Sequence, residues 1–322
     1  MASFSLKRFP RLRRAWHAIR RTARRFFWAP WLCANALRRH FRHDVVLYDG
    51  YGPYRGWKLL PENWGDDLNY TFFSEITGMK MIPVPHTAWS FPVHRHLLIG
   101  SILNWSDLNG ADVYGSGIID PGQPVHGVPR RIYGVRGPLT RDVLLARGID
   151  CPPAYGDPAL LLPLFYSPPR NPDGPVVVVP HVNTDDSPAL QALLARGCRR
   201  VDMRTPPRWQ DVPDQIAGAS LVLSESLHGL IVAEAYRVPC VWVEFIPHGH
   251  FDSTRDWSFK FRDFFASIGK CGATPLQLFA MRELPDFGTL RAAWTPARFN
   301  PMDLASRFPF PFSVPPRLET TL

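Results

Sequence analysis

Residues 221–236 read Leu-Val-Leu-Ser-Glu-Ser-Leu-His-Gly-Leu-Ile-Val-Ala-Glu-Ala-Tyr, and they are the most informative segment of the chain. Its first three residues are apolar, as in a buried strand, and residues 230–236 are mostly apolar over the length of a short helix. The polar triplet Ser224-Glu225-Ser226 separates the two segments. A strand, a polar loop and a helix in this order form half of a βαβ unit, so the stretch predicts an α/β protein with a parallel sheet.

The same stretch predicts an anion site. His228 and Gly229 stand where the predicted helix begins, and the free N–H groups at a helix N-terminus favour phosphate or carboxylate. The glycine allows a ligand to approach closely. We therefore expect Ser226, Leu227, His228 and Gly229 to contact an anionic ligand. The alternative is a serine N-cap followed by a histidine packed in the core.

Short β-rich runs alternate with helical patterns through the rest of the chain from Asp44. The predicted strands are residues 45–48, 96–99, 112–114, 131–135, 176–179, 221–223 and 240–245. The predicted helices are residues 68–76, 138–146, 188–195, 230–236 and 261–268. Several of the strands are wholly apolar, which is typical of a parallel sheet covered on both faces.

A proline-rich segment divides this body in two. Residues 167–175 hold four prolines and a glycine, so they form neither helix nor central strand and are predicted to be a linker. We expect two Rossmann-like α/β domains, residues 44–166 and 176–290, and a proline-rich C-terminal strap, residues 291–322. Ligands of open α/β sheets bind beyond the carboxyl ends of the strands, so the crevice between the domains is the expected site.

The charge of the chain is concentrated at its N-terminus. The 322 residues carry a net charge of +9, but residues 1–43 alone carry +12 and the remainder −3. This distribution argues against a nucleic-acid enzyme, whose body needs a basic groove. With 45% apolar and 20% charged residues, the chain can build large cores, so a wholly disordered protein is excluded.

The N-terminal arm, residues 1–43, has the pattern of a basic amphipathic helix. Large apolar residues recur every three or four positions from Leu12 to Phe26, and most of the arginines lie off that face. Such a helix suits an anionic membrane surface, which places the protein at the cytoplasmic face of the membrane. A cleaved targeting peptide and a solvated tail are the alternatives. The apolar stretch 26–37 is too short to span a bilayer.

The cysteines and histidines indicate no metal site. The five cysteines are an odd number, widely separated and without a C-x-x-C pair, which argues against a disulfide scaffold and favours a reduced, intracellular environment. The pairs His94/His96 and His248/His250 have no accompanying acid or cysteine spacing, so we interpret them as loop and strand residues.

A second polar cluster opens the helix predicted at residues 68–76. It reads Asn63-Trp-Gly-Asp-Asp-Leu-Asn69, in which Asp66 is placed to cap the helix. Capping explains one acid, not the whole cluster. We therefore expect Asn63, Asp67 and Asn69 to bind sugar hydroxyls.

Cations for an anionic ligand stand near other predicted strand ends. Arg136 follows a strand and is expected to point into the crevice, and Arg141 lies one helical turn further on. Lys260 and Arg262 begin the helix predicted at 261–268 and add two further candidates. Asp157 is either a turn residue or a carboxylate of the crevice that contacts the acceptor.

Five motifs, taken in order, resemble the polysaccharide pyruvyl transferase family. They are Asn63-x-Gly-Asp66, the turn at 114–117, Val135-Arg-Gly-Pro-x-Thr-Arg141, Gly156-Asp-Pro158 and Ser224-x-Ser-Leu-His-Gly229. The resemblance covers residues 44 to about 270, and residues 260–269 look like the branch that acts on rhizobial-type exopolysaccharides. It implies a fold similar to that of the two-domain GT-B glycosyltransferases.

The resemblance also implies a reaction. The donor would be phosphoenolpyruvate, and the acceptor two hydroxyls of one sugar, free or in a lipid-linked oligosaccharide, closed into a cyclic pyruvate ketal without a cofactor or metal. His228 would be the acid, and Asp66 or Asp67 the base or orienting group for the acceptor hydroxyl. Arg136 and Arg141 would hold the carboxylate and phosphate of the donor.

One position departs from the family pattern. The family commonly has arginine two residues before the histidine, and this chain has Ser226. Arg141, Lys260 or Arg262 must then replace that cation, unless the donor differs. A GT-B glycosyltransferase using a nucleotide sugar and a non-catalytic scaffold of a polysaccharide assembly complex are therefore alternatives.

Overall fold

The computed structural model describes residues 34–35, 38, 44–50, 53–54, 57–58, 63–84, 94–184, 186–204, 206–247 and 255–317. The N-terminal arm lies almost entirely outside these residues, and so does the pair His248/His250. The amphipathic helix in the arm therefore stays a prediction.

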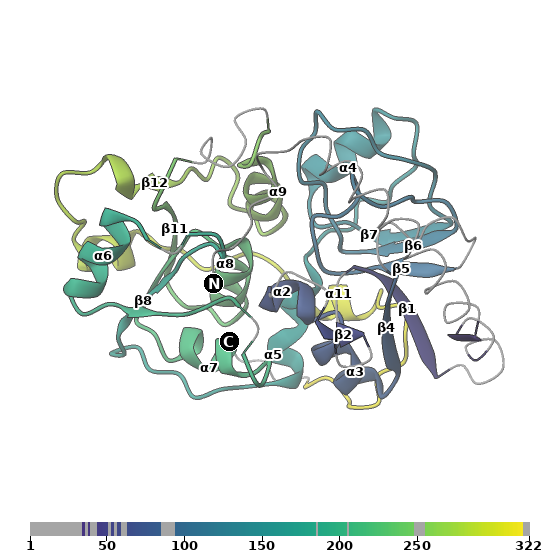
Figure 1. Ribbon diagram of the computed structural model, residues 1–322, viewed down its shortest axis with the longest axis horizontal. Coiled ribbons are helices and arrows are strands. Elements are labelled where there is room, and N and C mark those ends of the chain that lie inside the picture. The colour runs from purple at the N-terminus through teal and green to yellow at the C-terminus, as the bar shows by residue number, and fades with distance from the viewer. Residues whose placement is uncertain are drawn as a thin grey trace, which may run out of the picture.

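Two five-stranded parallel sheets form the body of the molecule (Figure 1). The first has the order β4-β1-β5-β6-β7 and contains β1 (Val45–Asp49), β4 (Lys80–Val84), β5 (Arg95–Leu97), β6 (Ala111–Tyr114) and β7 (Arg131–Gly134). The second has the order β12-β11-β10-β8-β9 and contains β8 (Val176–Val179), β9 (Arg199–Arg200), β10 (Leu221–Ser224), β11 (Cys240–Glu244) and β12 (Leu276–Gln277). A short antiparallel pair, β2 (Pro53–Tyr54) and β3 (Trp57–Lys58), stands apart.

Both sheets share one doubly wound order. Within each sheet the second strand in sequence lies on one side of the first, and the later strands follow on the other side. The strand order therefore reverses between β1 and β5 in the first sheet and between β8 and β10 in the second. The prediction of a parallel α/β fold with two sheets is confirmed, while the GT-B-like arrangement stays a prediction.

The helices connect and cover the sheets. They are α2 (Trp64–Asp67), α3 (Thr71–Thr77), α4 (Pro138–Leu145), α5 (Leu162–Phe165), α6 (Pro188–Ala195), α7 (Asp211–Ala217), α8 (Leu227–Ala235), α9 (Phe259–Ser267), α10 (Phe287–Ala293) and α11 (Pro301–Ala305), with the 3₁₀ helices η2 (Pro158–Leu161) and η4 (Leu278–Ala280). Side-chain caps start several of them: Asn63 Oδ1 accepts from Gly65 N–H at 3.1 Å, and Ser187 Oγ accepts from Leu190 N–H at 3.1 Å.

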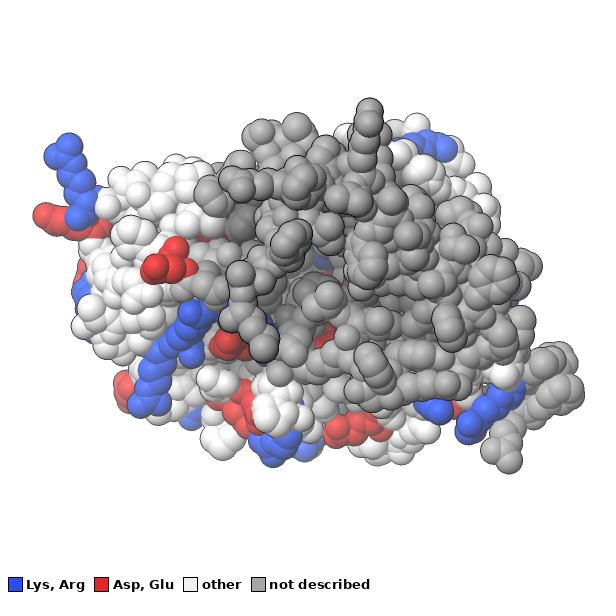
Figure 2. All heavy atoms as spheres, in the orientation of Figure 1, with Lys and Arg blue, Asp and Glu red and all other residues white. Residues whose placement is uncertain are grey.

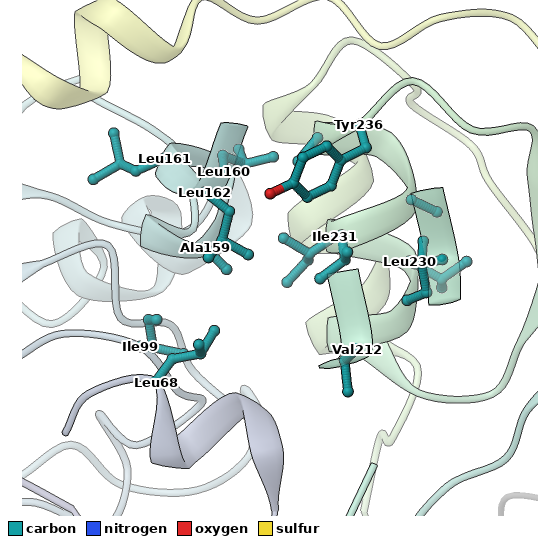
Figure 3. Packing of buried hydrophobic residues seen from close by; sticks show 14 of the residues in the cluster. Leu68, Ile99, Ala159, Leu160, Leu161, Leu162, Val212, Leu230, Ile231 and Tyr236 are labelled. Carbon is teal, nitrogen blue, oxygen red and sulfur yellow. The ribbon is translucent and has the colours of Figure 1, made fainter. Parts of the chain in front are cut away.

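One hydrophobic cluster joins the two sheets. It includes Leu68 and Ile99 from the first half, the apolar run of η2 and α5, and Leu230 and Ile231 on α8 (Figure 3). Every residue of α8 is buried, and most of its residues are apolar, as expected for a helix in the core of a protein. The first and second halves therefore share a packed core around this helix.

The C-terminal strap returns to the first half of the molecule (Figure 1). Ser313 N–H donates to the carbonyl of Ile76 at 2.8 Å, and the ring of Phe308 stacks on Phe73 with centroids 5.5 Å apart. Tyr114 donates from its hydroxyl to the carbonyl of Leu304 at 2.7 Å. Through residue 317, the strap is thus packed and does not extend freely.

Candidate functional site

A cavity of about 390 Å³ lies where the carboxyl ends of strands from both sheets meet. Its described lining comes from the ends of β1, β5, β6, β8, β10 and β11 and the segments that follow them, and from α2, α8 and α9: Asp49, Gly50, Asn63, Asp66, Asn69, Ile99, Ser101, Ile102, Trp105, Ile119, His181, Val182, Asn183, Glu225, Ser226, Leu227, His228, Trp257, Lys260 and Phe261. The pairs β1/β5 and β8/β10 are the two points at which the strand order reverses. The cavity therefore occupies the position that the doubly wound fold favours for ligands, in the predicted crevice.

His228 lies in the first turn of α8, because the helix begins at Leu227, three residues before the predicted start at residue 230. Its side chain lines the cavity and is 9% exposed. Among the described residues, Nε2 of the ring has no hydrogen-bond partner. The ring lies against the backbone of Gly65, where an added Cβ would come within 1.9 Å of Nδ1. Gly65 thus permits close contact between α2 and α8.

The surroundings of His228 favour its neutral form. Burial, followed by the positive charges of Lys260 and Arg136, lowers the pKa of His228 to about 3. A bound phosphate or carboxylate beside the ring would stabilise the imidazolium and raise this pKa.

The N-terminus of α8 is open toward the same space. Ser226 is its N-cap residue, but the Ser226 side chain accepts no hydrogen bond from the first turn. Ser224 Oγ instead accepts from Ser226 N–H at 3.1 Å and donates to the Ser226 carbonyl at 2.8 Å, which fixes the loop. Gly229 packs inward, since an added Cβ would lie 2.4 Å from Ser224 Oγ.

Glu225 organises the loops of the second half, a role that the sequence did not indicate. It is 1% exposed and lines the cavity. Its carboxylate accepts backbone N–H bonds from His181 at 3.2 Å, Phe245 at 3.0 Å and Ile246 at 3.4 Å. The carboxylate therefore ties the segments after β8, β10 and β11 together.

Residues of the polar cluster at 63–69 have two kinds of role: some hold the fold together by hydrogen bonds, and some line the cavity. Asn63 caps α2, a role expected for Asp66, and still reaches the cavity. Asn69 exchanges two 2.9 Å hydrogen bonds with the backbone of Ile99, which holds α2 on the end of β5. Asp66 also lines the cavity, whereas Asp67 is not part of its described lining.

Lys260 is the one lysine or arginine in the described lining. Burial and the charge of Arg136 lower its pKa to about 8, against the opposing effect of Asp66 and Glu225. Its ammonium lies 5.9 Å from the ring centroid of Trp257 and 5.2 Å from that of Phe261.

Arg136 does not point into the crevice as expected. It is fully buried and donates to Asp263 Oδ2 at 3.1 Å, to the Ile118 carbonyl at 2.7 Å and to Ser101 Oγ. Ser101 reaches the cavity, so the guanidinium stands behind its wall. A Cβ on Gly117 would lie 2.3 Å from its Cζ, which shows how closely the guanidinium is enclosed.

Three more predicted residues lie outside the described lining. Arg141 donates to the Cys151 carbonyl at 2.9 Å, and Arg262 pairs with Asp256. Asp157 caps η2 by accepting from Ala159 N–H at 3.0 Å, which agrees with the interpretation as a turn residue. Burial raises the pKa of Asp157 to about 6.

Sequence reasoning missed several polar and aromatic lining residues: Ser101, Trp105, His181, Asn183 and Trp257. Residues 181–183 follow the carboxyl end of β8 directly, and 101–105 follow β5. The strand-end rule that led to Arg136 applies equally to these segments.

His94, His96 and Asp112 form a separate cluster at β5 and β6. Their ligand atoms lie within 4.8 Å of one another, and His94 Nε2 is 2.9 Å from Asp112 Oδ2. The sequence offered no acid for this histidine pair because Asp112 comes from the neighbouring strand. Arg130 pairs with the same carboxylate and would compete with a metal ion.

In the part of the chain that the structure describes, no helix combines the length and apolar character needed to cross a membrane.

The chain is similar to known proteins over part of its length. Residues 130–245 match the family model of the polysaccharide pyruvyl transferases. The chain is also 28% identical over 266 residues to the succinoglycan biosynthesis protein ExoV of Rhizobium meliloti (strain 1021), over 79% of this chain and 75% of that protein. No solved structure matches significantly. The resemblance to the polysaccharide pyruvyl transferases is confirmed.

Proposed function

We propose that this chain transfers pyruvate from phosphoenolpyruvate to two hydroxyls of one sugar in an exopolysaccharide repeat unit, and so forms a cyclic ketal. One observation carries the proposal: the cavity at the two reversal points brings His228, Lys260 and Asp66 together. The segment that holds His228 lies within the match to the pyruvyl transferase family.

The donor would bind at the N-terminus of α8. Its phosphate and carboxylate would accept from the uncapped N–H groups of the first turn and pair with Lys260. Lys260 thereby supplies the charge that the family commonly takes from an arginine at the position of Ser226. Arg136 would act from behind the wall through its positive charge, without touching the donor.

The electrostatics of the cavity suit this arrangement. Three carboxylates line it, but Asp49 accepts from Arg95 Nε at 3.0 Å and Glu225 accepts three backbone N–H bonds. Their negative charges are therefore partly compensated within the protein. Asp66 lines the same cavity and would supply the carboxylate for the acceptor hydroxyl.

The steps follow from this placement. His228, protonated once the donor is bound, gives its proton to the methylene carbon, which becomes a methyl group, and the first sugar hydroxyl bonds to the central carbon. The proton of that hydroxyl passes to Asp66. The second hydroxyl then bonds to the same carbon, phosphate leaves with the bridging oxygen, and the second hydroxyl proton leaves with it.

The test is turnover with defined substrates. The full chain is incubated with phosphoenolpyruvate and oligosaccharides from the exopolysaccharide of the organism that makes this protein. The amount of released phosphate is compared with the amount of pyruvylated product identified by its mass. Equal amounts of phosphate and pyruvate ketal are expected. Stabilisation by nucleoside diphosphates, with neither phosphate release nor stabilisation by phosphoenolpyruvate, would favour the glycosyltransferase instead.

A further inference from the structure

The cavity has an aromatic wall in addition to its polar floor. Trp105 lies on the segment after β5, and Trp257 precedes α9, so the two rings reach one cavity from the two halves of the molecule. Ile102 and Ile119 extend the apolar lining, and Phe261 adds a third ring. Trp105 is 42% exposed, which is unusual for so large a side chain.

The proposed donor does not account for this wall. Phosphoenolpyruvate is small and carries its charge on phosphate and carboxylate groups, which need cations and N–H donors. An exposed indole face makes little favourable interaction with phosphate or carboxylate groups. A sugar ring, by contrast, has apolar C–H groups on its faces and hydroxyls at its edge, so it packs on an aromatic ring while amide and carboxylate groups bind its rim.

Other residues of the cavity carry the polar groups that would bind the rim of a sugar. Asn63 and Asp66 line the same cavity and carry an amide and a carboxylate. Phe261 is held in place by stacking on Trp242, with centroids 4.6 Å apart and planes 10° apart. The Lys260 ammonium is 5.9 Å from the ring centroid of Trp257 and 5.2 Å from that of Phe261, so the aromatic wall adjoins the cation assigned to the donor.

We propose that Trp105 and Trp257 form the acceptor subsite and that it takes an oligosaccharide rather than a single sugar. Trp257, beside Lys260, packs on the sugar that receives pyruvate. Trp105, more exposed, packs on the next sugar of the chain. This inference rests on the proposed function for the identity of the reacting sugar, but the binding of a neutral oligosaccharide to the two tryptophans is a separate property.

The experiment measures binding and turnover separately, in the full chain. The probes are oligosaccharides from partial acid hydrolysis of the same exopolysaccharide and the methyl glycosides of its component sugars. Trp105→Ala and Trp257→Ala are compared with the wild type, Trp105→Phe is the conservative variant, and Phe279→Ala, at a ring 37% exposed outside the cavity, is the control.

We expect each alanine variant to weaken oligosaccharide binding, measured calorimetrically without donor, by about tenfold. The acceptor KM should rise by a similar factor with the KM for phosphoenolpyruvate unchanged. Trp105→Phe should restore most of the affinity, and Trp105→Ala should leave methyl glycoside binding unaffected.

Wild-type oligosaccharide affinity in both alanine variants, or no binding to the wild type, would overturn the subsite. A rise in the phosphoenolpyruvate KM with unchanged acceptor affinity would do the same. If binding depends on the tryptophans but phosphoenolpyruvate is never consumed, the subsite stands and the proposed function falls.

Discussion

At the scale of single residues, the contact between Gly65 and His228 is the most restrictive feature of the site. The Gly65 backbone carries no side chain, and the imidazole ring occupies the space that one would fill. Neither residue alone reveals this contact, because the two are far apart in the sequence.

Gly65→Ala should therefore reduce turnover much more than it disturbs folding. Its methyl group would overlap the imidazole, so the ring must turn or α2 must move away from α8. A displacement of about 1 Å can cost about 100-fold in rate, and we expect kcat to fall by that order. Gly122→Ala is the control, since its Cβ would meet only an ordinary contact at 3.4 Å. Near wild-type kcat in Gly65→Ala would contradict the close contact.

Lys260 should determine the pH above which kcat/KM for phosphoenolpyruvate declines. Its pKa of about 8 means that the ammonium loses its charge as the pH rises through that value, so kcat/KM for phosphoenolpyruvate should fall above pH 8. Lys260→Arg should move the fall to higher pH. Lys260→Gln should lower kcat/KM at pH 7 by about 10- to 100-fold and remove this alkaline limb. An unchanged pH profile in Lys260→Gln would remove Lys260 from the donor site.

At the scale of elements, the central strands of both sheets and the edge strand β7 were predictable, whereas the other three edge strands were not. The strands at residues 176–179 and 221–223 are apolar on both faces, and the helix at 188–195 has a serine cap and a proline in its first turn, so local signals suffice. β4, β9 and β12 were missed because they are edge strands: β4 contains Pro83, and the other two have only two residues each.

The site was predictable to the extent that strand ends determine it. His228, Lys260, Asn63 and Asp66 line the cavity as expected. Arg136 could not be placed from the sequence, because its partner Asp263 is 127 residues away on α9. A local pattern gives the end of a strand, but not whether a distant carboxylate already occupies the side chain.

The junction of α4 with α9 should contribute strongly to stability. Asp263 accepts from Arg136 Nε at 3.1 Å, from Thr140 N–H at 2.9 Å and from Thr140 Oγ1 at 2.7 Å, all buried. Asp263→Ala leaves Arg136 without its carboxylate and should lower the free energy of unfolding by about 3–5 kcal/mol. Urea denaturation measures the loss.

Arg136→Ala discriminates between the structural and donor-binding roles of this arginine. We expect a comparable loss of stability, because Asp263 is then the unpaired buried charge. Wild-type stability together with lost affinity for phosphoenolpyruvate would instead return Arg136 to the donor site.

At the scale of the whole molecule, the charge is divided between a basic arm and a mildly acidic body. On the described part of the face in Figure 2, Lys and Arg are interspersed with Asp and Glu and form no single basic patch. Among the described lining residues, the one lysine or arginine is Lys260. We propose that the arm, residues 1–43, serves to locate the protein rather than to take part in the chemistry, and that it holds the protein on the inner face of the membrane near a lipid-linked acceptor.

Deletion of residues 1–43 should separate location from catalysis. Each basic residue near an anionic surface contributes about 1 kcal/mol, so the truncated chain should no longer sediment with phosphatidylserine-containing vesicles in moderate salt. Turnover on a soluble oligosaccharide should be unchanged. Equal sedimentation of the full and truncated chains would show that the arm is not the membrane contact.

The most direct test of the central claim follows the methylene carbon of the donor by NMR. Phosphoenolpyruvate labelled with ¹³C at that carbon is incubated in D₂O with the oligosaccharide acceptor and either the wild type or His228→Ala. We expect the wild type to convert the vinyl signal into a sugar-linked ketal methyl carrying one solvent deuterium, and the folded variant to leave the vinyl signal unchanged. A sugar-linked vinyl ether, a phosphorylated sugar or equal conversion by His228→Ala would contradict the claim.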